Sequence, residues 1–201
     1  MQILPAAKGM ELALKILRSG GVVAHATETC YGFACDLRNP DAVNKLFAIK
    51  QRPLDQPVSA LFVSVDDAKK YVEWNDEAQK LADEYLPGPL TIILKQKKPV
   101  LLIPCPLPGP TLGLRVSSHP VATELIERFG SPLSTTSANI HGKPNPYSAD
   151  DIVNQFNNQE FRPDLILDSG KLLPTPPSTV IDLTRPEKNV LRKGSTELPK
   201  K

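Results

Sequence analysis

Apolar and polar positions along the chain follow two different periods, which predicts a mixture of helices and strands. Residues 9–19 place Leu12, Ile16 and Leu17 on one helical face, and the two glycines that follow are a strong stop signal. Asn39, followed by a proline, is typical of the start of a further helix. On the same grounds we expect helices over 39–50, 64–74, 75–86, 117–130 and 148–156, and strands over 22–26, 30–37, 58–63, 89–95, 112–116, 132–139, 164–168, 178–183 and 189–194.

These strands and helices alternate without the strict regularity of a doubly wound fold. Such a pattern favours a single α/β domain built around a mixed sheet that is flanked by helices. The 201 residues contain no linker and no shift in composition that would divide them. We therefore expect residues 1–201 to form one domain.

The composition is that of an ordinary globular domain, with 40% hydrophobic and 23% charged residues. The chain has no run of about 18 apolar residues and no signal-peptide pattern, so we expect no membrane span. Its three cysteines, Cys30, Cys35 and Cys105, are odd in number and form no C-x-x-C pair. This pattern indicates a reducing compartment, the cytoplasm, and argues against a structural zinc site.

Proline is unusually frequent, with 21 residues in the chain. The prolines cluster at 103–113 and 172–180, between apolar segments. Both clusters predict loops with a restricted backbone, of the kind that can line a binding site.

The stretch KQRP places two cations, Lys50 and Arg52, directly ahead of a rigid proline. Taken alone, it is typical of a solvated surface turn, and a lysine near a helix end also suits the helix dipole. The alternative is an anion site, in which both cationic heads converge on phosphate or carboxylate.

Two further stretches carry small hydroxyl side chains. Thr27 and Thr29 would point to one face if they lay in a strand, although threonine is also simply a good strand former. The segment STTSANIHGKP carries Ser137 and Asn139 out of a predicted strand, at the kind of strand end where ligands gather in α/β proteins. A turn rich in serine, asparagine and glycine explains that composition equally well.

Two arginines, Arg115 and Arg192, fall within predicted apolar strands, where burial calls for an anionic partner. With Lys50 and Arg52 they make four cations that one cavity can share, and this excess suits a polyanion such as a nucleoside triphosphate. The net charge of +2 argues against a surface that is basic throughout, but it allows a local basic cavity. The structural alternative is a set of salt bridges to Asp36, Asp168 or Asp182.

The common nucleotide and hydrolase fingerprints are missing from the sequence. There is no Walker loop, no G-x-G-x-x-G after a strand and no G-x-S-x-G elbow. The three histidines stand too far apart in sequence to indicate a metal site. A nucleotide bound by this chain is therefore held in another way.

Taken together, the stretches TETCYG, KQRP, LPGPLTIIL, LGLRV, TSAN-x-x-GKP, DSG and STVIDL…VLRKG resemble the YrdC family, the L-threonylcarbamoyladenylate synthases. The hallmark of that family is a K-x-R element with a distant S-x-N element, here Lys50, Arg52, Ser137 and Asn139. The resemblance extends over about residues 9–194. It implies a twisted α/β domain with a large basic cavity on one side of the sheet.

The resemblance also implies a reaction. L-threonine and bicarbonate form N-carboxy-threonine, whose carboxylate attacks the α-phosphate of ATP to give threonylcarbamoyl-AMP and pyrophosphate. Mg²⁺ is expected to enter with ATP and to bridge its phosphates. Separate threonylcarbamoyl-transferase machinery then modifies the adenosine at position 37 of tRNA.

Carried over residue by residue, the resemblance assigns Lys50 and Arg52 to the triphosphate, where they neutralise charge in the transition state. It assigns Ser137 and Asn139 to the nucleotide and its phosphates, and Arg192 to a position along the nucleotide. No general acid or base stands out, as expected for catalysis by positioning and electrostatics.

The resemblance assigns the threonine substrate to Thr27, Arg115 and Ser178, with Arg115 at the substrate carboxylate. One departure is Ala26, where the family usually has a proline before the first threonine. The competing interpretation is a non-catalytic protein of the same fold that binds double-stranded RNA or tRNA. A weak contact of the enzyme with such RNA is also an expectation.

Overall fold

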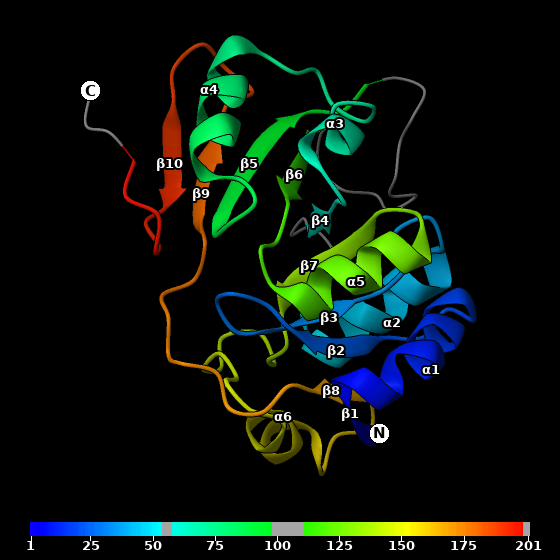
Figure 1. Cartoon of the computed structure of the whole chain (residues 1–201). Helices are drawn as coiled ribbons and strands as arrows, with labels where there is room; N and C mark the ends of the chain where they lie inside the picture. The colour runs from blue at the N-terminus through cyan, green and yellow to red at the C-terminus, as the bar shows by residue number, and fades with distance from the viewer. Residues whose placement is uncertain (54–57, 98–110, 199–201) are drawn as a thin grey trace.

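Ten strands form one mixed sheet in the computed structural model, which describes residues 1–53, 58–97 and 111–198 (Figure 1). They lie side by side in the order β1-β8-β2-β3-β7-β4-β6-β5-β9-β10. Their bounds are β1 Gln2–Pro5, β2 Val23–Ala26, β3 Tyr31–Ala34, β4 Ser59–Leu61, β5 Leu90–Lys95, β6 Thr111–Arg115, β7 Leu133–Ser137, β8 Leu165–Asp168, β9 Thr179–Asp182 and β10 Asn189–Arg192.

Strand β7 joins the two halves of this sheet. It runs antiparallel to β3 on one side and antiparallel to β4 on the other. In the first half β1 and β2 are parallel to β8, and in the second half β4 is parallel to β6 and β5 to β9. The residues that leave β7 therefore start from the centre of the sheet.

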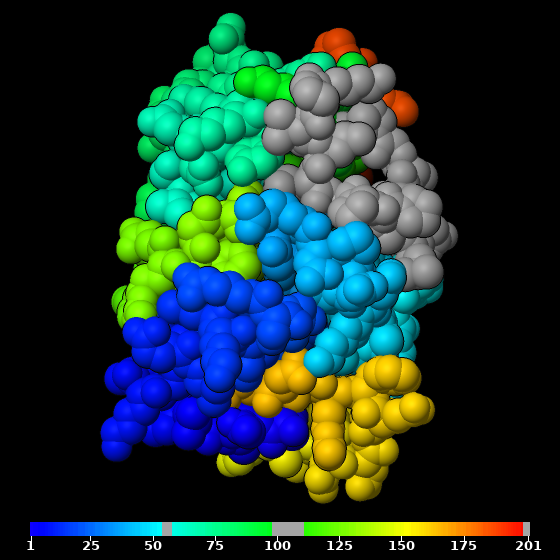
Figure 2. Space-filling view, turned by 90° about the vertical axis from the view of Figure 1, so that its right-hand side faces the viewer, coloured from blue at the N-terminus to red at the C-terminus, as the bar shows by residue number. Residues whose placement is uncertain are grey.

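Six helices in the described part of the chain flank the sheet, and α1 and α5 pack together on one face of its first half. Figure 2 shows the blue N-terminal segment beside the yellow-green α5 at the surface. Among the described residues, no helix is long and apolar enough to cross a membrane. The helices are α1 Ala6–Arg18, α2 Pro40–Lys50, α3 Val65–Ala68, α4 Asp76–Tyr85, α5 Pro120–Phe129 and α6 Ala149–Phe156.

Strand β3 shows how the two faces of the first half are divided. Ala34 packs in the core cluster formed with α1 and α5, whereas its neighbour Phe33 packs on the other face. There Phe33 meets Phe156 of α6 edge to face, with ring centroids 5.6 Å apart, and shares its core cluster with Leu46 of α2. Successive residues of a strand point to opposite faces, so both faces of this half are covered by helices.

The second half of the sheet is covered by helices on one face. Ile92, Leu112 and Leu114 are buried in the core cluster that also holds residues of α3 and α4. The alternate positions carry a different set of side chains, which includes Thr91, Gly113 and Arg115 and lines a cavity. The period of two in β5 and β6 therefore places a polar surface opposite the helices.

Most predicted elements are confirmed to within a few residues, and β1 is the one that the pattern missed. This strand is four residues long and mostly exposed. It is held by parallel pairing with β8, and the Gln2 amide donates to the carbonyl oxygen of Asp164 at 2.8 Å. Because its partner lies more than 150 residues away, no local pattern marks it.

The helix expected over 64–74 is wrong in length, because α3 ends at Ala68. The following residues hydrogen-bond to the end of β5 instead of continuing the helix. The Glu73 amide donates to the Lys95 carbonyl at 2.8 Å, and the Lys97 amide donates to the Tyr71 carbonyl at 2.9 Å. Tertiary pairing thus overrides the helical pattern here.

The buried face of α1 also differs from the predicted one. Leu17 is buried as expected, but Leu12 and Ile16 are only partly buried at the edge of the cluster. The stripe that faces the sheet runs through Met10, Ala13, Leu14 and Leu17. The buried face of the helix is therefore rotated away from the predicted one, and Leu17 is common to both.

Of the two proline clusters, one can be compared with the structure. The chain has no regular element between β8 and β9, which confirms the loop predicted around 172–180. Most of 103–113 lies outside the described residues, as does Cys105. Cys30 and Cys35 are buried free thiols.

Candidate active site

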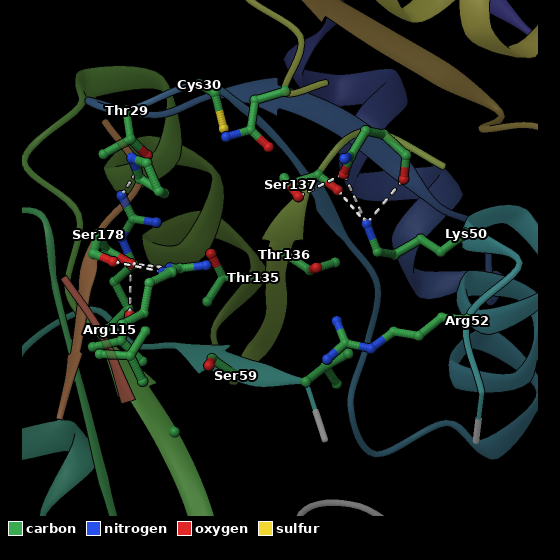
Figure 3. Close-up of a pocket in the computed structure, with 18 of the residues that line it drawn as sticks. Thr29, Cys30, Lys50, Arg52, Ser59, Arg115, Thr135, Thr136, Ser137 and Ser178 are labelled. Carbon is green, nitrogen blue, oxygen red and sulfur yellow. Dashed lines mark hydrogen bonds between the residues drawn. The ribbon is translucent and has the colours of Figure 1, made fainter. Parts of the chain in front are cut away.

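A cavity of about 520 Å³ lies on the face of the second half of the sheet that is opposite α3 and α4. Lys50, Arg52, Arg115 and Arg192 all line it, which confirms that the four cations share one cavity. No aspartate or glutamate stands among the lining residues of the described part of the chain. Figure 3 shows Lys50 and Arg52 on one side of the cavity and Arg115 and Ser178 on the other. Such a wall is suited to a polyanion.

Lys50 is positioned by the end of α2, whose start is capped by the side chain of Asn39. Its side chain does not lie in solvent, because the residue is only 2% exposed. The Nζ atom donates to the Ser137 carbonyl at 2.5 Å and to the Asn139 carbonyl at 3.0 Å. The solvated-turn interpretation is therefore wrong for this lysine.

The environment of Lys50 changes its protonation. Burial, and to a smaller extent the positive charge of Arg52, lower the pKa of Lys50 from 10.5 to about 7. A bound anion favours the charged form of an ammonium group. The charge of Lys50 is thus sensitive to what occupies the cavity.

Ser137 and Asn139 form one hydrogen-bond network with Lys50, beyond the end of β7. The Ser137 hydroxyl donates to Asn139 Oδ1 at 2.6 Å, and Lys50 Nζ lies 3.2 Å from the same oxygen. Asn139 Nδ2 donates in turn to the Lys143 carbonyl at 2.5 Å. The K-x-R and S-x-N elements, 87 residues apart between Lys50 and Ser137, are therefore in direct contact.

Arg52 is brought to the cavity by a turn at the end of α2. Gln51 has a left-handed backbone with φ of 49°, and the Arg52 amide donates to the Phe47 carbonyl at 3.1 Å. The Arg52 side chain is half-buried, and this burial lowers the pKa of its guanidinium. Figure 3 shows it extending toward the middle of the cavity.

The T-x-T interpretation placed Thr27 and Thr29 in a strand, and this is wrong. They belong to the four-residue turn between β2 and β3, which is closed by pairing of Ala26 with Tyr31. Thr27 Oγ1 donates to the Cys30 carbonyl at 2.7 Å and lies 3.1 Å from Thr29 Oγ1. Thr29 and Cys30 line the cavity, whereas Thr27 lies behind them and holds the turn.

Arg115 ends β6 and meets this turn. Its Nη2 atom donates to Glu28 Oε1 at 2.7 Å and to Thr29 Oγ1 at 3.0 Å. Glu28 also accepts a hydrogen bond from the Ser117 hydroxyl. Although burial alone would raise the pKa of Glu28, Arg115 and Ser117 hold it below its ordinary value.

Ser178 lies at the end of the proline loop, beside β5 and β10. Its hydroxyl is 3.0 Å from Thr91 Oγ1 and accepts from Arg192 Nη2 at 3.0 Å. Arg192 Nε donates to the Ser178 carbonyl at 3.0 Å. Ser178 is 2% exposed, so a buried hydroxyl pair and an arginine from the edge strand complete this wall.

Sequence reasoning missed the acidic partner in this site. Arg115 pairs with Glu28, and the three aspartates considered as partners have other contacts. Asp36 binds Arg38, Asp168 accepts from Tyr31, and Asp182 accepts from the amide of Thr184. The signal for Glu28 in the sequence is its place between the two threonine hydroxyls of TETCYG.

The family model described as telomere recombination, Sua5_yciO_yrdC, matches residues 15–194. The chain belongs to the Sua5/YciO/YrdC family. This membership agrees with the geometry, because the K-x-R and S-x-N elements that suggested the family meet at one cavity.

Within the Sua5/YciO/YrdC family, a threonylcarbamoyl-AMP synthase of Pyrococcus abyssi is 34% identical over 192 residues, 94% of this chain and 55% of that protein. P. abyssi Sua5 complexed with L-threonine matches with a TM-score of 0.86 and 33% identity, over 96% of this chain and 58% of that structure. Escherichia coli YciO matches with a TM-score of 0.83 and 29% identity, over 98% of this chain and 94% of YciO. The chain thus spans little more than half of the P. abyssi protein and nearly all of YciO.

Proposed function

We propose that this protein is an L-threonylcarbamoyladenylate synthase, a nucleotidyltransferase. The observation that carries the proposal is a cavity wall with four cations and no described carboxylate, in a chain of the Sua5/YciO/YrdC family. The name of the P. abyssi relative and the L-threonine in P. abyssi Sua5 support the same activity.

In the proposed reaction the amine of L-threonine adds to bicarbonate with loss of water and forms a carbamate. A carbamate oxygen then attacks the α-phosphorus of ATP. The bond from the α-phosphorus to the bridging oxygen of the β-phosphate breaks, and that oxygen leaves with pyrophosphate. The products are threonylcarbamoyl-AMP and pyrophosphate.

Negative charge moves to the leaving pyrophosphate in this step, and the Lys50 and Arg52 side of the cavity is suited to stabilise it. Lys50 also binds the carbonyl oxygens of Ser137 and Asn139, so it ties the S-x-N segment to α2. In the proposal these two residues face the nucleotide, and Arg192 lies along it. Catalysis then depends on fixed charges rather than on a general base.

The other side of the cavity is proposed to hold threonine. The Arg115 guanidinium is matched to the substrate carboxylate, and the Ser178 hydroxyl is a hydrogen-bond partner for the amino acid. Thr27 contributes indirectly, because its hydroxyl closes the turn that places Thr29 at the cavity. Two substrates bound from opposite sides would meet over β7.

Mg²⁺ enters the proposal as part of the substrate, the complex with ATP. The described wall offers hydroxyl and amide oxygens, such as those of Thr136 and Asn139, and no carboxylate. This donor set suits an ion whose ligands are mostly phosphate oxygens and water.

The proposed product is a mixed anhydride, which water cleaves readily. We therefore propose that it passes to threonylcarbamoyl-transferase machinery that acts on tRNA in the cytoplasm. Direct contact of this chain with tRNA or double-stranded RNA is proposed to be weak, because the net charge of +2 provides little non-specific attraction.

The proposal is tested by measuring pyrophosphate release with each substrate omitted in turn. We expect release only when ATP, L-threonine and bicarbonate are all present. A parallel titration with tRNA at low and moderate salt should give weak binding that fades as salt rises. No pyrophosphate under any condition, with tight tRNA binding that survives moderate salt, would contradict the enzyme and favour an RNA-binding protein.

A further inference from the structure

We propose that Glu28 is a positioning residue, which fixes the Arg115 guanidinium so that its Nε–H, unpaired among the described residues, is left for a carboxylate in the cavity. The inference deepens the proposed function and rests on it, because the carboxylate is that of threonine. Neither the K-x-R nor the S-x-N element includes this glutamate.

The first observation is how completely one end of the guanidinium is used. Arg115 Nη2 carries two hydrogens, and two acceptors lie within reach of it. Glu28 Oε1 accepts at 2.7 Å and Thr29 Oγ1 accepts at 3.0 Å. This nitrogen therefore has no hydrogen left for a ligand.

The second observation concerns the burial and hydrogen bonding of Arg115 Nε. This atom is buried and has no hydrogen-bond partner among the described residues, although the residue lines the cavity. An orphan donor on a charged group costs free energy when it is buried, so such donors are usually paired. A ligand oxygen supplied from the cavity would satisfy it.

The third observation is that Glu28 is itself held in place. Its second oxygen, Oε2, accepts from the Ser117 hydroxyl, two residues beyond Arg115. Its backbone lies in the turn that Thr27 closes by accepting from the amides of Thr29 and Cys30 at 3.3 Å each. The Glu28 side chain is 15% exposed and that of Arg115 is 10% exposed, so water competes little for the pair.

The Glu28–Arg115 ion pair is not bidentate. Arginine–carboxylate pairs are frequently bidentate, with both carboxylate oxygens on the guanidinium. Here one Glu28 oxygen binds Arg115 and the other binds Ser117. The carboxylate thus sets the orientation of the guanidinium and leaves Nε without a partner among the described residues.

The inference predicts a selective kinetic defect. Glu28→Ala should raise the KM for L-threonine tenfold or more, while the KM for ATP stays within twofold of the wild-type value. Glu28→Gln keeps an acceptor for Nη2, so it should fold normally and give a smaller rise. The matched control is Glu127→Gln, which changes an exposed glutamate of α5 and should change neither KM.

A second measurement reports on Arg115 without any turnover. In ¹⁵N-labelled protein, the Arg115 Nε–H signal, identified by its loss in Arg115→Lys, should be sharp in the wild type and in Glu127→Gln. It should broaden or disappear in Glu28→Ala and shift when L-threonine is added to the wild type.

The possible results distinguish a failure of the proposed function from a failure of the positioning role of Glu28. If the wild type releases no pyrophosphate from ATP, threonine and bicarbonate, the proposed function fails, and the Arg115 signal alone decides the role of Glu28. An unchanged Arg115 signal in folded Glu28→Ala would overturn the positioning role. So would an equal rise of both KM values that follows a fall in melting temperature, since that is the result of a merely structural ion pair.

Discussion

At the scale of single residues, the most informative side chain is Lys50. Two carbonyl groups and one amide oxygen surround its ammonium group, and it is almost fully buried. The amino group of Lys50 holds the loop beyond β7 through these hydrogen bonds and at the same time faces a cavity with three arginines. Structure and anion binding therefore depend on the same group.

The lowered pKa of Lys50 leads to a prediction about protons. In the free protein at pH 8 the group, with a pKa of about 7, is mostly neutral. A bound triphosphate favours the charged form and raises this pKa, so ATP binding at pH 8 should take up close to one proton. Calorimetric titration in buffers of different ionisation enthalpy measures that number.

The control is Lys50→Met, which keeps an unbranched side chain one atom shorter than lysine and removes the titrating group. We expect almost no proton uptake from this variant at pH 8. The same proton uptake in both proteins would mean that Lys50 does not gain a proton when the phosphates bind.

At the scale of elements, the C-terminal strand and the proline loop are locked together at Gly194. A Cβ atom at this position would lie 2.0 Å from the Pro177 carbonyl oxygen and 2.6 Å from the Thr179 nitrogen. The Gly194 amide donates to Thr179 Oγ1 at 3.0 Å. The glycine of VLRKG thus allows the chain to pass close behind Ser178.

We predict that Gly194→Ala damages the threonine side of the cavity. The added methyl group must push backbone atoms aside, which costs about 1–3 kcal/mol of unfolding free energy. The KM for L-threonine should rise more than the KM for ATP, because Ser178 moves with the loop. The control is Lys193→Ala, an exposed neighbour. Wild-type stability and kinetics in Gly194→Ala would contradict the close approach of Gly194 to the backbone of Pro177 and Thr179.

The elements themselves were largely predictable, because they depend on local signals. The Asn39, Ser64, Asn75 and Ser148 caps each begin a helix where the sequence indicates one. The pairing of β1 with β8 and the early end of α3 depend on remote backbone partners, which no local pattern reports.

The sequence predicted which residues form the site better than it predicted which residues they hydrogen-bond to. The resemblance brought Lys50, Arg52, Ser137 and Asn139 together, and the structure places them at one cavity. The partner of Arg115 was not predictable, because the turn that carries Glu28 meets β6 only in the folded sheet.

At the scale of the whole molecule, one buried group links stability to pH. His25 of β2 is fully buried, and burial lowers its pKa from 6.5 to about 4. Its charge is influenced by His119, Arg115 and Glu28, which lie near it. Between pH 6.5 and pH 4 the unfolded chain binds a proton that the folded chain does not, so the contribution of His25 is present above pH 6.5 and is lost as pH falls.

We therefore predict that the unfolding free energy falls faster below pH 6.5 in the wild type than in His25→Leu. The difference should reach roughly 3 kcal/mol by pH 4, from a shift of about 2.5 pKa units. Denaturant titrations at several pH values between 7.5 and 4 measure it. Parallel stability curves for the two proteins would show that His25 is not kept neutral by burial.

In the proposed function, a basic cavity on one face of the sheet makes threonylcarbamoyl-AMP. The mass of the product formed from ¹³C-bicarbonate, L-threonine and ATP by the wild type, by Arg52→Ala and by Arg38→Ala tests this function directly. Arg38 is an exposed arginine paired with Asp36, so its loss should leave the rate unchanged. Loss of Arg52 should cost about 2–4 kcal/mol of transition-state stabilisation.

We expect threonylcarbamoyl-AMP that is one mass unit heavier than the unlabelled product, with one pyrophosphate released per molecule. We also expect a large loss of rate in Arg52→Ala alone. An unlabelled adenylate, or equal rates in the wild type and both variants, would contradict the proposed function.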